Sequence, residues 1–353
     1  EELNHYFRQR PELAEMDRSA ALALIGAAMA RRHANLADTM PDGYRLGVFV
    51  GCSEGPVHSI EAAYEEFHRG QSAYIKPSLA KRISPQAVSH FVAEQVGARS
   101  STASTFVAGS ASGLLAVAQA VQAIQTDLVD GAVVGGVEAP VVPQRFRLYD
   151  ALRIMSRNFN DHPHTASRPF AADRDGFVLS EGCGFLVIER EKMAEKRGAT
   201  SYGHIVSQGQ AFPGMHPVDR QAACMAGALN RAKVKKSELV HVQAAACSSP
   251  VADSEEAAAL TKILDTVVKD VHVSSIKSMI GETLGASGPL ALIAVLIGMR
   301  DNFIPPTINL DQPCEDCDLN HVANEALEIE VPAALVNAFD TEAGYVSVVV
   351  RKG

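Results

Sequence analysis

The sequence lacks three features that would each point to a class of protein. No run of about 18 apolar residues is uninterrupted, which argues against a membrane-spanning helix. No long basic run occurs, and 41 acidic against 32 basic residues give a net charge of -9, so nucleic acid and anionic membranes are poor candidate partners. The first four residues, EELN, show no basic-then-apolar signal pattern. We therefore expect a cytoplasmic protein.

Cysteine is also scarce and scattered. Of the six cysteines, only Cys314 and Cys317 lie close together, as one CxxC pair. A single pair, without a second one or nearby histidines, is weak evidence for a zinc or redox site. We interpret it as two cysteines in a loop of a reduced protein, and no disulfide framework is indicated. We expect neither a metal nor a cofactor.

No proline- or serine-rich linker divides the chain, although its 353 residues exceed what one small core holds. The apolar fraction of 47% and charged fraction of 21% are typical of a soluble globular protein. We therefore expect two α/β halves, residues 1–200 and 201–353, that share one layered core.

Apolar segments at strand and helix lengths recur in both halves. In the first half, strands are predicted over 46–51, 105–109 and 131–135, with helices over 16–32 and 111–124. In the second half, strands are predicted over 240–245, 271–274 and 346–350, with helices over 254–264 and 284–300. Strand, helix and strand at these spacings form βαβ units, which predict parallel sheets.

Four sequence motifs carry a family resemblance. Residues 167–177 (SRPFAADRDGF) precede SEGCG at 180–184, residues 274–281 read SSIKSMIG, residues 304–310 read IPPTINL, and residues 135–138 read GGVE. Taken in chain order, these motifs resemble those of the ketosynthases of fatty-acid and polyketide synthesis, members of the thiolase superfamily.

The resemblance implies a thiolase-like five-layer αβαβα fold built of two related halves. The family's first strand would precede Met16 by several dozen residues, and only 15 residues do, so we expect that strand to be missing. The family dimerises through a strand and helix beside the active site. Here that implies an interface at Thr105, Phe106 and Val107 and the helix over 111–124.

The resemblance also locates the family's catalytic nucleophile. A ketosynthase uses a cysteine thiolate at a helix N-terminus, where the helix dipole favours negative charge. The family's CxSG motif falls on residues 110–113 (SASG), so Ser110 replaces the cysteine. Serine is a far weaker nucleophile without a neighbouring base. We therefore interpret Ser110 as the N-cap of the following helix.

Both catalytic histidines of the family are replaced. In residues 243–253 (QAAACSSPVAD), the family's "NAHGTxTxxxD" motif places Ala245 at the first histidine, and Asp253 retains the final aspartate. Glu282 stands where the second histidine would follow Gly281. A carboxylate there opposes a developing enolate rather than stabilising it. The retained Lys277 is expected to pair with Glu282 as a structural replacement.

The oxyanion loop is altered as well. The family's NxFGFGG motif falls on residues 337–343 (NAFDTEA), where Phe339, Asp340 and Thr341 occupy substrate-tunnel and oxyanion-loop positions. Three glycines have become Asp340, Glu342 and Ala343, which adds negative charge and removes backbone freedom. With four elements lost, we expect no catalytic residue and no condensation by this chain alone.

This pattern resembles the chain length factor (KSβ) subunits of type II polyketide synthases. The resemblance implies a heterodimer with an active ketosynthase, in which this chain shapes the acyl tunnel. It also implies that acyl carrier protein docks mainly on the partner, because both the carrier and this chain are acidic. Two alternatives stay open: an acyltransferase or starter-loading ketosynthase that uses Ser110, and a homodimeric scaffold without enzymatic activity.

Overall fold

The computed structural model describes residues 16–36, 43–69, 78–84, 86–98 and 102–353. The N-terminal residues 1–4, which lack a signal pattern, lie outside this part.

The N-terminal sheet has four described strands in the order β2-β1-β3-β4. The central strand β1 (Leu46–Gly51) is parallel to β2 (Ala103–Phe106) and to β3 (Gly131–Glu138). The strand β4 (Gly182–Glu189) is antiparallel to β3. All residues of β1 and β3 are buried, which explains why both read as continuous apolar or small-residue runs.

The C-terminal sheet has six described strands in the order β5-β12-β11-β6-β7-β9. Strands β6 (His241–Gln243), β7 (His272–Ser274), β9 (Asn320–His321) and β11 (Ala333–Asp340) are parallel, and β12 (Gly344–Arg351) is antiparallel to β11 and to β5 (His204–Ala211). Strands β7, β6, β11 and β12 correspond in order to β2, β1, β3 and β4 of the N-terminal sheet, and β5 and β9 are additional. β12 pairs with β5 on its outer side, whereas no described strand pairs with the corresponding side of β4.

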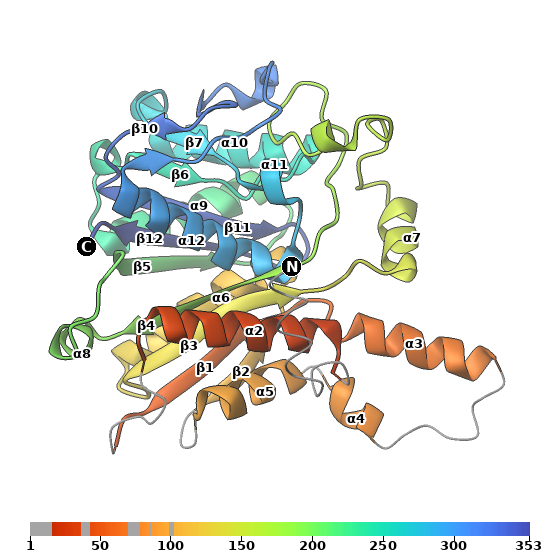
Figure 1. The fold of residues 1–353 in the computed structure, drawn as a ribbon. Helices are drawn as coiled ribbons and strands as arrows, with labels where there is room; N and C mark the ends of the chain where they lie inside the picture. Colours follow the sequence, from red (N-terminus) through yellow and green to blue (C-terminus); the bar gives the residue numbers. More distant parts are fainter. Residues whose placement is uncertain (1–15, 37–42, 70–77, 85, 99–101) are drawn as a thin grey trace.

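Helices fill the space between the sheets and cover both outer faces. The central layer holds α6 (Ser112–Gln125) and α12 (Ser287–Asp301), which share one apolar core with both sheets. Helices α2 (Arg18–His33) and α5 (Ala87–Val96) cover the N-terminal sheet, and α9 (Pro217–Ala232) and α10 (Pro250–Leu264) cover the C-terminal sheet. Figure 1 shows the N-terminal sheet (orange to yellow) below the C-terminal sheet (green to blue). The expected five-layer αβαβα fold is confirmed.

Residue alternation along the strands assigns side chains to the layers. On β1, Val48 and Val50 pack outward against α2 and α5, while Phe49 packs inward against α6. On β11, Leu335 packs outward and Val336 inward in the same way. The apolar segment Leu284–Asp301 is long enough to cross a membrane, but 61% of it is buried inside the fold, as expected for a core helix.

Several short elements complete the chain. They are α3 (Val57–His68), α4 (Ser78–Arg82), α7 (Pro143–Ala151), α8 (Glu191–Lys196), α11 (Lys277–Ile280), the strand pair β8 (Phe303–Ile304) and β10 (Leu327–Glu328), and 3-10 turns that include Gly109–Ala111, Leu284–Ala286 and Glu315–Cys317.

Several predicted boundaries differ from the structure, and two of the differences have a clear local cause. The strand predicted over 105–109 ends at Phe106, because Gly109 adopts a φ of 54° and opens a 3-10 turn. The helix predicted from residue 254 begins at Pro250, behind Ser249, whose hydroxyl accepts the Ala252 N–H at 3.2 Å. A capping serine followed by proline at the first helical position is a start signal that the sequence contained.

The buried histidine of β6 should make a contribution to stability that is lost in acid. His241 is buried, its Nε2 lies 3.0 Å from Ser274 Oγ, and burial, with a smaller effect of His272, lowers its pKa from 6.5 to about 3. Unfolding exposes the ring and lets it bind a proton below pH 6.5. The contribution of neutral His241 to the free energy of unfolding is therefore complete above pH 6.5. We expect it to decrease by on the order of 4 kcal/mol as the pH falls towards 3.

Urea titrations of the wild type and of His241→Gln across this pH range measure that decrease. The variant should lose part of the slope between pH 6.5 and 4, whereas His216→Gln, at an exposed histidine, should keep it. Equal slopes for the wild type and His241→Gln would contradict the prediction.

Candidate functional site

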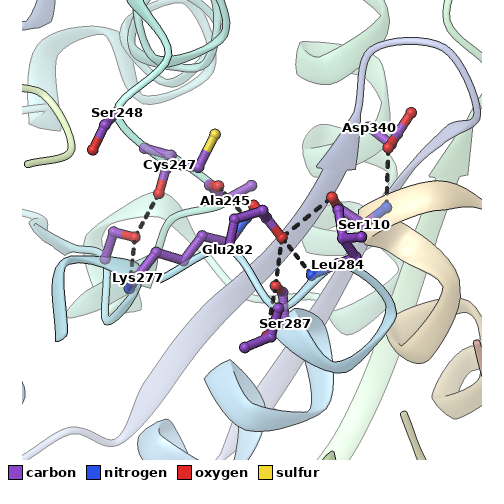
Figure 2. Close-up of polar contacts among 12 residues, drawn as sticks. Ser110, Ala245, Cys247, Ser248, Lys277, Glu282, Leu284, Ser287 and Asp340 are labelled. Carbon is purple, nitrogen blue, oxygen red and sulfur yellow. Dashed lines mark hydrogen bonds and ion pairs between the residues drawn. The ribbon is translucent and has the colours of Figure 1, made fainter. Parts of the chain in front are cut away.

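The site forms where the carboxyl ends of the parallel strands in the two sheets converge. Ser110 follows β2, Ala245 follows β6, Glu282 follows β7 and α11, and Asp340 ends β11. Figure 2 shows these residues within one connected set of polar contacts. The topology thus brings together four positions that the sequence separates by up to 230 residues.

Ser110 does not cap the helix as predicted. It lies in the 3-10 turn Gly109–Ala111, one turn before α6, and its hydroxyl donates to Glu282 Oε1 at 3.3 Å. Ser112 closes the turn instead, because its Oγ accepts the Ala108 N–H at 2.7 Å and donates to the Gly109 carbonyl at 2.6 Å. The N-cap interpretation of Ser110 is therefore wrong, because the 3-10 turn moves the start of the helix to Ser112 and the N-cap position to Ala111.

Glu282 is the centre of the site. Its side chain is 3% exposed, and its Oε1 accepts the Leu284 N–H at 2.8 Å and the hydroxyls of Ser287 (2.7 Å) and Ser110 (3.3 Å). Its Oε2 lies 2.6 Å from Lys277 Nζ. Figure 2 shows the carboxylate between these donors. The carboxylate thus links the turn before α6 to the turn before α12.

Lys277 completes a buried ion pair, as the sequence predicted. Its ammonium donates to Glu282 at 2.6 Å and to the Ala245 carbonyl at 2.7 Å. Burial opposes the charged ammonium, but the adjacent Glu282 carboxylate outweighs it, so the pKa of Lys277 lies above its usual value. The lysine therefore remains a cation and ties the strand end of β6 to that of β7.

The first histidine position holds only backbone contacts. Ala245 donates its N–H to Glu256 Oε1 at 3.0 Å, and its carbonyl accepts from Lys277. The retained Asp253 fixes the segment, since it accepts the N–H groups of Cys247 (2.9 Å) and Ser248 (3.1 Å). The segment keeps its shape, but its Ala245 side chain can neither donate nor accept a proton.

The Asp340 carboxylate accepts a hydrogen bond from the backbone N–H of Ser110. Asp340 Oδ2 accepts this N–H at 3.0 Å, while Oδ1 accepts the N–H groups of Glu342 (3.0 Å) and Ala343 (2.9 Å). Gly109 is adjacent, and a Cβ there would lie 1.9 Å from Asp340 Oδ2. Hydrogen bonds to this one carboxylate therefore join the β11–β12 turn to the start of α6, and we call this contact the Asp340 clasp.

The remaining predicted positions lie around this clasp. Phe339 is half-buried, and its ring packs on Tyr345 with ring centres 5.3 Å apart, while Thr341 is exposed in the turn. At the interface positions, Thr105 bonds Ser89 at 2.9 Å and Phe106 stacks on Phe49.

Glu138 is a site residue to which the sequence assigned no role. It is fully buried at the end of β3, and its carboxylate accepts the N–H groups of Ser53 (2.7 Å), Glu54 (3.0 Å) and Gly285 (3.2 Å). Burial raises its pKa to about 7. In the sequence, the only signal for this role of Glu138 is its place in the GGVE motif at the end of an apolar strand.

The polar groups around Ser110 are engaged with one another in hydrogen bonds and one ion pair. Ser110 has a carboxylate as its hydroxyl partner, and that carboxylate already accepts from three other donors. In the described part of the chain, no group of three or more His, Cys, Asp or Glu side chains is arranged to hold a metal ion. The site is a closed network of donors and acceptors.

Removing the Asp340 clasp should destabilise the start of α6. In Asp340→Ala, three N–H groups lose their acceptor, and we expect the free energy of unfolding to decrease by about 1–3 kcal/mol. Asp340→Asn keeps one acceptor oxygen, so its free energy of unfolding should decrease by less. Hydrogen exchange of the Ser110 amide measures the local effect, and unchanged protection in Asp340→Ala would contradict it.

The fold is that of the thiolase-superfamily ketosynthases. The family model for the beta-ketoacyl synthase N-terminal domain matches residues 2–194, and that for the C-terminal domain matches residues 199–311. The chain belongs to the beta-ketoacyl synthase family.

Among similar proteins, 3-oxoacyl-[acyl-carrier-protein] synthase 2 of Staphylococcus aureus is 30% identical over 93% of this chain and 82% of the relative. The ketoacyl synthase alpha subunit of the tetracenomycin polyketide synthase of Streptomyces glaucescens is 33% identical over 90% of this chain and 77% of the relative. The solved structure of the ishigamide ketosynthase/chain length factor superimposes with a TM-score of 0.89 at 27% identity, covering 96% of this chain and 83% of that one.

Proposed function

We propose that this chain is a non-condensing ketosynthase-like subunit, a chain length factor, that pairs with an active beta-ketoacyl-ACP synthase in the cytoplasm and shapes the acyl tunnel. The observation that carries the proposal is the Asp340 carboxylate on the Ser110 backbone N–H. A thioester carbonyl needs such an N–H free in order to stabilise its oxyanion. A resident carboxylate blocks that interaction and repels the developing charge.

The three other substitutions support the same conclusion independently. Ser110 lacks the thiol, Ala245 lacks the first imidazole, and Glu282 puts a negative charge where an enolate would form. Removing a single general base or oxyanion donor costs on the order of 10²–10³ in rate. The combined losses leave no useful condensation by this chain.

The partner surface is inferred from the edge strand β2 and from segments that follow strands β2 and β3. No described strand pairs with the outer side of β2, and Val107 just beyond it is 63% exposed. Helix α7 and the residues after it expose four further large apolar side chains: Phe146, Leu148, Leu152 and Ile154. Because β2 and β3 are both parallel to β1, Val107 and α7 both follow the carboxyl ends of their strands, at the same end of the sheet. An open edge strand and exposed apolar side chains at this end of the sheet support a stable protein interface there.

Acyl carrier protein is proposed to contact mainly the partner ketosynthase. One solved structure, similar to this chain with a TM-score of 0.88 and 27% identity over 96% of its length, is a type II polyketide synthase acyl-carrier protein in complex with its ketosynthase. With a net charge of -9, this chain repels an acidic carrier over long range, so we propose that the carrier docks mainly on the active subunit.

Ser110 is expected to remain unmodified by acyl donors. Its hydroxyl bonds a carboxylate that is already engaged, and its N–H is occupied by Asp340. Incubation with acyl carrier protein thioesters, or with a fluorophosphonate, should leave no adduct on Ser110 in a peptide mass map. In the reconstituted complex, Ser110→Ala should leave the elongation rate within about twofold.

The control is the loss of the partner's own nucleophile, which should abolish elongation while the complex stays intact. A stoichiometric Ser110 adduct that disappears in Ser110→Ala would instead favour the serine acyltransferase. A stable homodimer that does not bind the cognate ketosynthase would favour the scaffold.

A further inference from the structure

The CxxC pair has a geometry that its sequence did not reveal. Cys314 precedes the 3-10 turn Glu315–Cys317, and the Cys317 N–H donates to the Cys314 carbonyl at 2.9 Å. A turn closed by this bond brings its end Cα atoms within about 7 Å of one another. Disulfides span Cα separations of about 4.4–6.8 Å. The turn thus holds the two cysteines near disulfide range.

The two thiols also share one buried cation. Arg174 is 7% exposed and faces both sulfurs, and its guanidinium lowers the pKa of the Cys314 thiol below its usual value. Cys317 is 0% exposed, and burial raises its pKa to about 11. The pair therefore combines a half-buried thiol beside a cation with a fully buried one, which is the asymmetry of an attacking and a resolving cysteine.

Arg174 connects this pair to the segment beside the site. Its Nη2 donates to the Pro250 carbonyl at 2.8 Å and to Ser254 Oγ at 2.7 Å, and its Nε lies 3.6 Å from Asp253. Ser254 Oγ in turn lies 3.9 Å from Cys317 Sγ. The thiols thus lie against the start of α10, which follows the Ala245 position.

We propose that Cys314 and Cys317 form a reversible disulfide by exchange with a small disulfide such as glutathione disulfide. The Cys314 thiolate attacks one sulfur of glutathione disulfide, forms a mixed disulfide and releases one glutathione thiolate. Cys317 then loses its proton to solvent, and its sulfur attacks Cys314 Sγ and releases the second glutathione. Two protein thiols are oxidised to one disulfide, and glutathione disulfide is reduced to two thiols.

The test uses the whole reduced chain, incubated with glutathione disulfide, quenched in acid, denatured, alkylated and mapped by mass spectrometry. Of six thiols, four should remain alkylatable, and the Cys314–Cys317 peptide should carry the disulfide. Dithiothreitol should restore all six.

Single variants distinguish the two roles. Cys317→Ser should accumulate a glutathione adduct on Cys314, because nothing resolves it, while Cys314→Ser should carry none on the buried Cys317. Cys183→Ser is the matched control, because burial raises the pKa of that thiol to about 11, and it should form the disulfide like the wild type. The proposal is overturned if both thiols stay alkylatable, or if adducts form on Cys317 or Cys183 in preference to Cys314.

Discussion

Replacing Lys277 by methionine should lower the free energy of unfolding by about 3–5 kcal/mol, because it leaves the Glu282 carboxylate buried without its cation. The ion pair is 2.6 Å long, and its two side chains are 7% and 3% exposed. Since whole domains are stable by only about 5–15 kcal/mol, this is a large fraction of the total. Urea unfolding followed by circular dichroism measures it.

Two further variants make this measurement specific. The double variant Lys277→Met with Glu282→Gln removes both charges and should recover much of the loss. Lys262→Met breaks an ion pair of similar length with Asp219, in which both side chains are 59% exposed, and should cost under about 1 kcal/mol. If Lys277→Met costs no more than Lys262→Met, the buried pair does not have the role described.

Val107→Asp should weaken association with the cognate ketosynthase by about 100-fold or more. If the interface lies at the end of β2, the variant buries a carboxylate in an apolar contact, and such a change commonly costs about 3 kcal/mol. Titration calorimetry or co-purification from co-expressed chains measures the loss. Expressed alone, the wild-type chain should aggregate, and co-expression should rescue it.

The matched control for the interface is Leu128→Asp. Leu128 is 54% exposed just after α6, at the opposite end of the N-terminal sheet from Val107. The Leu128→Asp variant should leave association with the ketosynthase unchanged. A wild-type chain that is a soluble, stable monomer, or equal losses for both variants, would contradict the proposed interface.

The sequence predicted the fold well because the signals were local or lay in ordered motifs. The strand at Leu46–Gly51 is confirmed to the residue, since an apolar run between polar segments defines both ends. The Lys277–Glu282 pair is also confirmed, because five residues around a tight turn keep the two side chains close.

The contacts that close the site could not be predicted in the same way. The bond from the Ser110 N–H to Asp340 joins residues 230 positions apart, and it depends on how the two halves pack. The N-cap interpretation of Ser110 is wrong, because nothing in SASG distinguishes a 3-10 turn from the first turn of an α-helix. Asp340 is recognisable in the sequence as a lost glycine, but its new acceptor role is a property of the assembled layers.

The two replacement carboxylates beside the central helices have a consequence for how this chain could evolve. Glu282 and Asp340 each accept a backbone N–H group at the turns that precede α12 and α6. In an enzyme, such N–H donors stay unpaired between turnovers so that they can stabilise the negative charge of the transition state. Because the donors are unpaired, the enzyme is less stable. Here these donors are paired permanently. Under the proposed non-condensing function, the conflict between activity and stability at this position is relaxed. Reversion to a catalyst would then require several simultaneous substitutions, each destabilising alone, so the proposed loss of condensation would be difficult to reverse one mutation at a time.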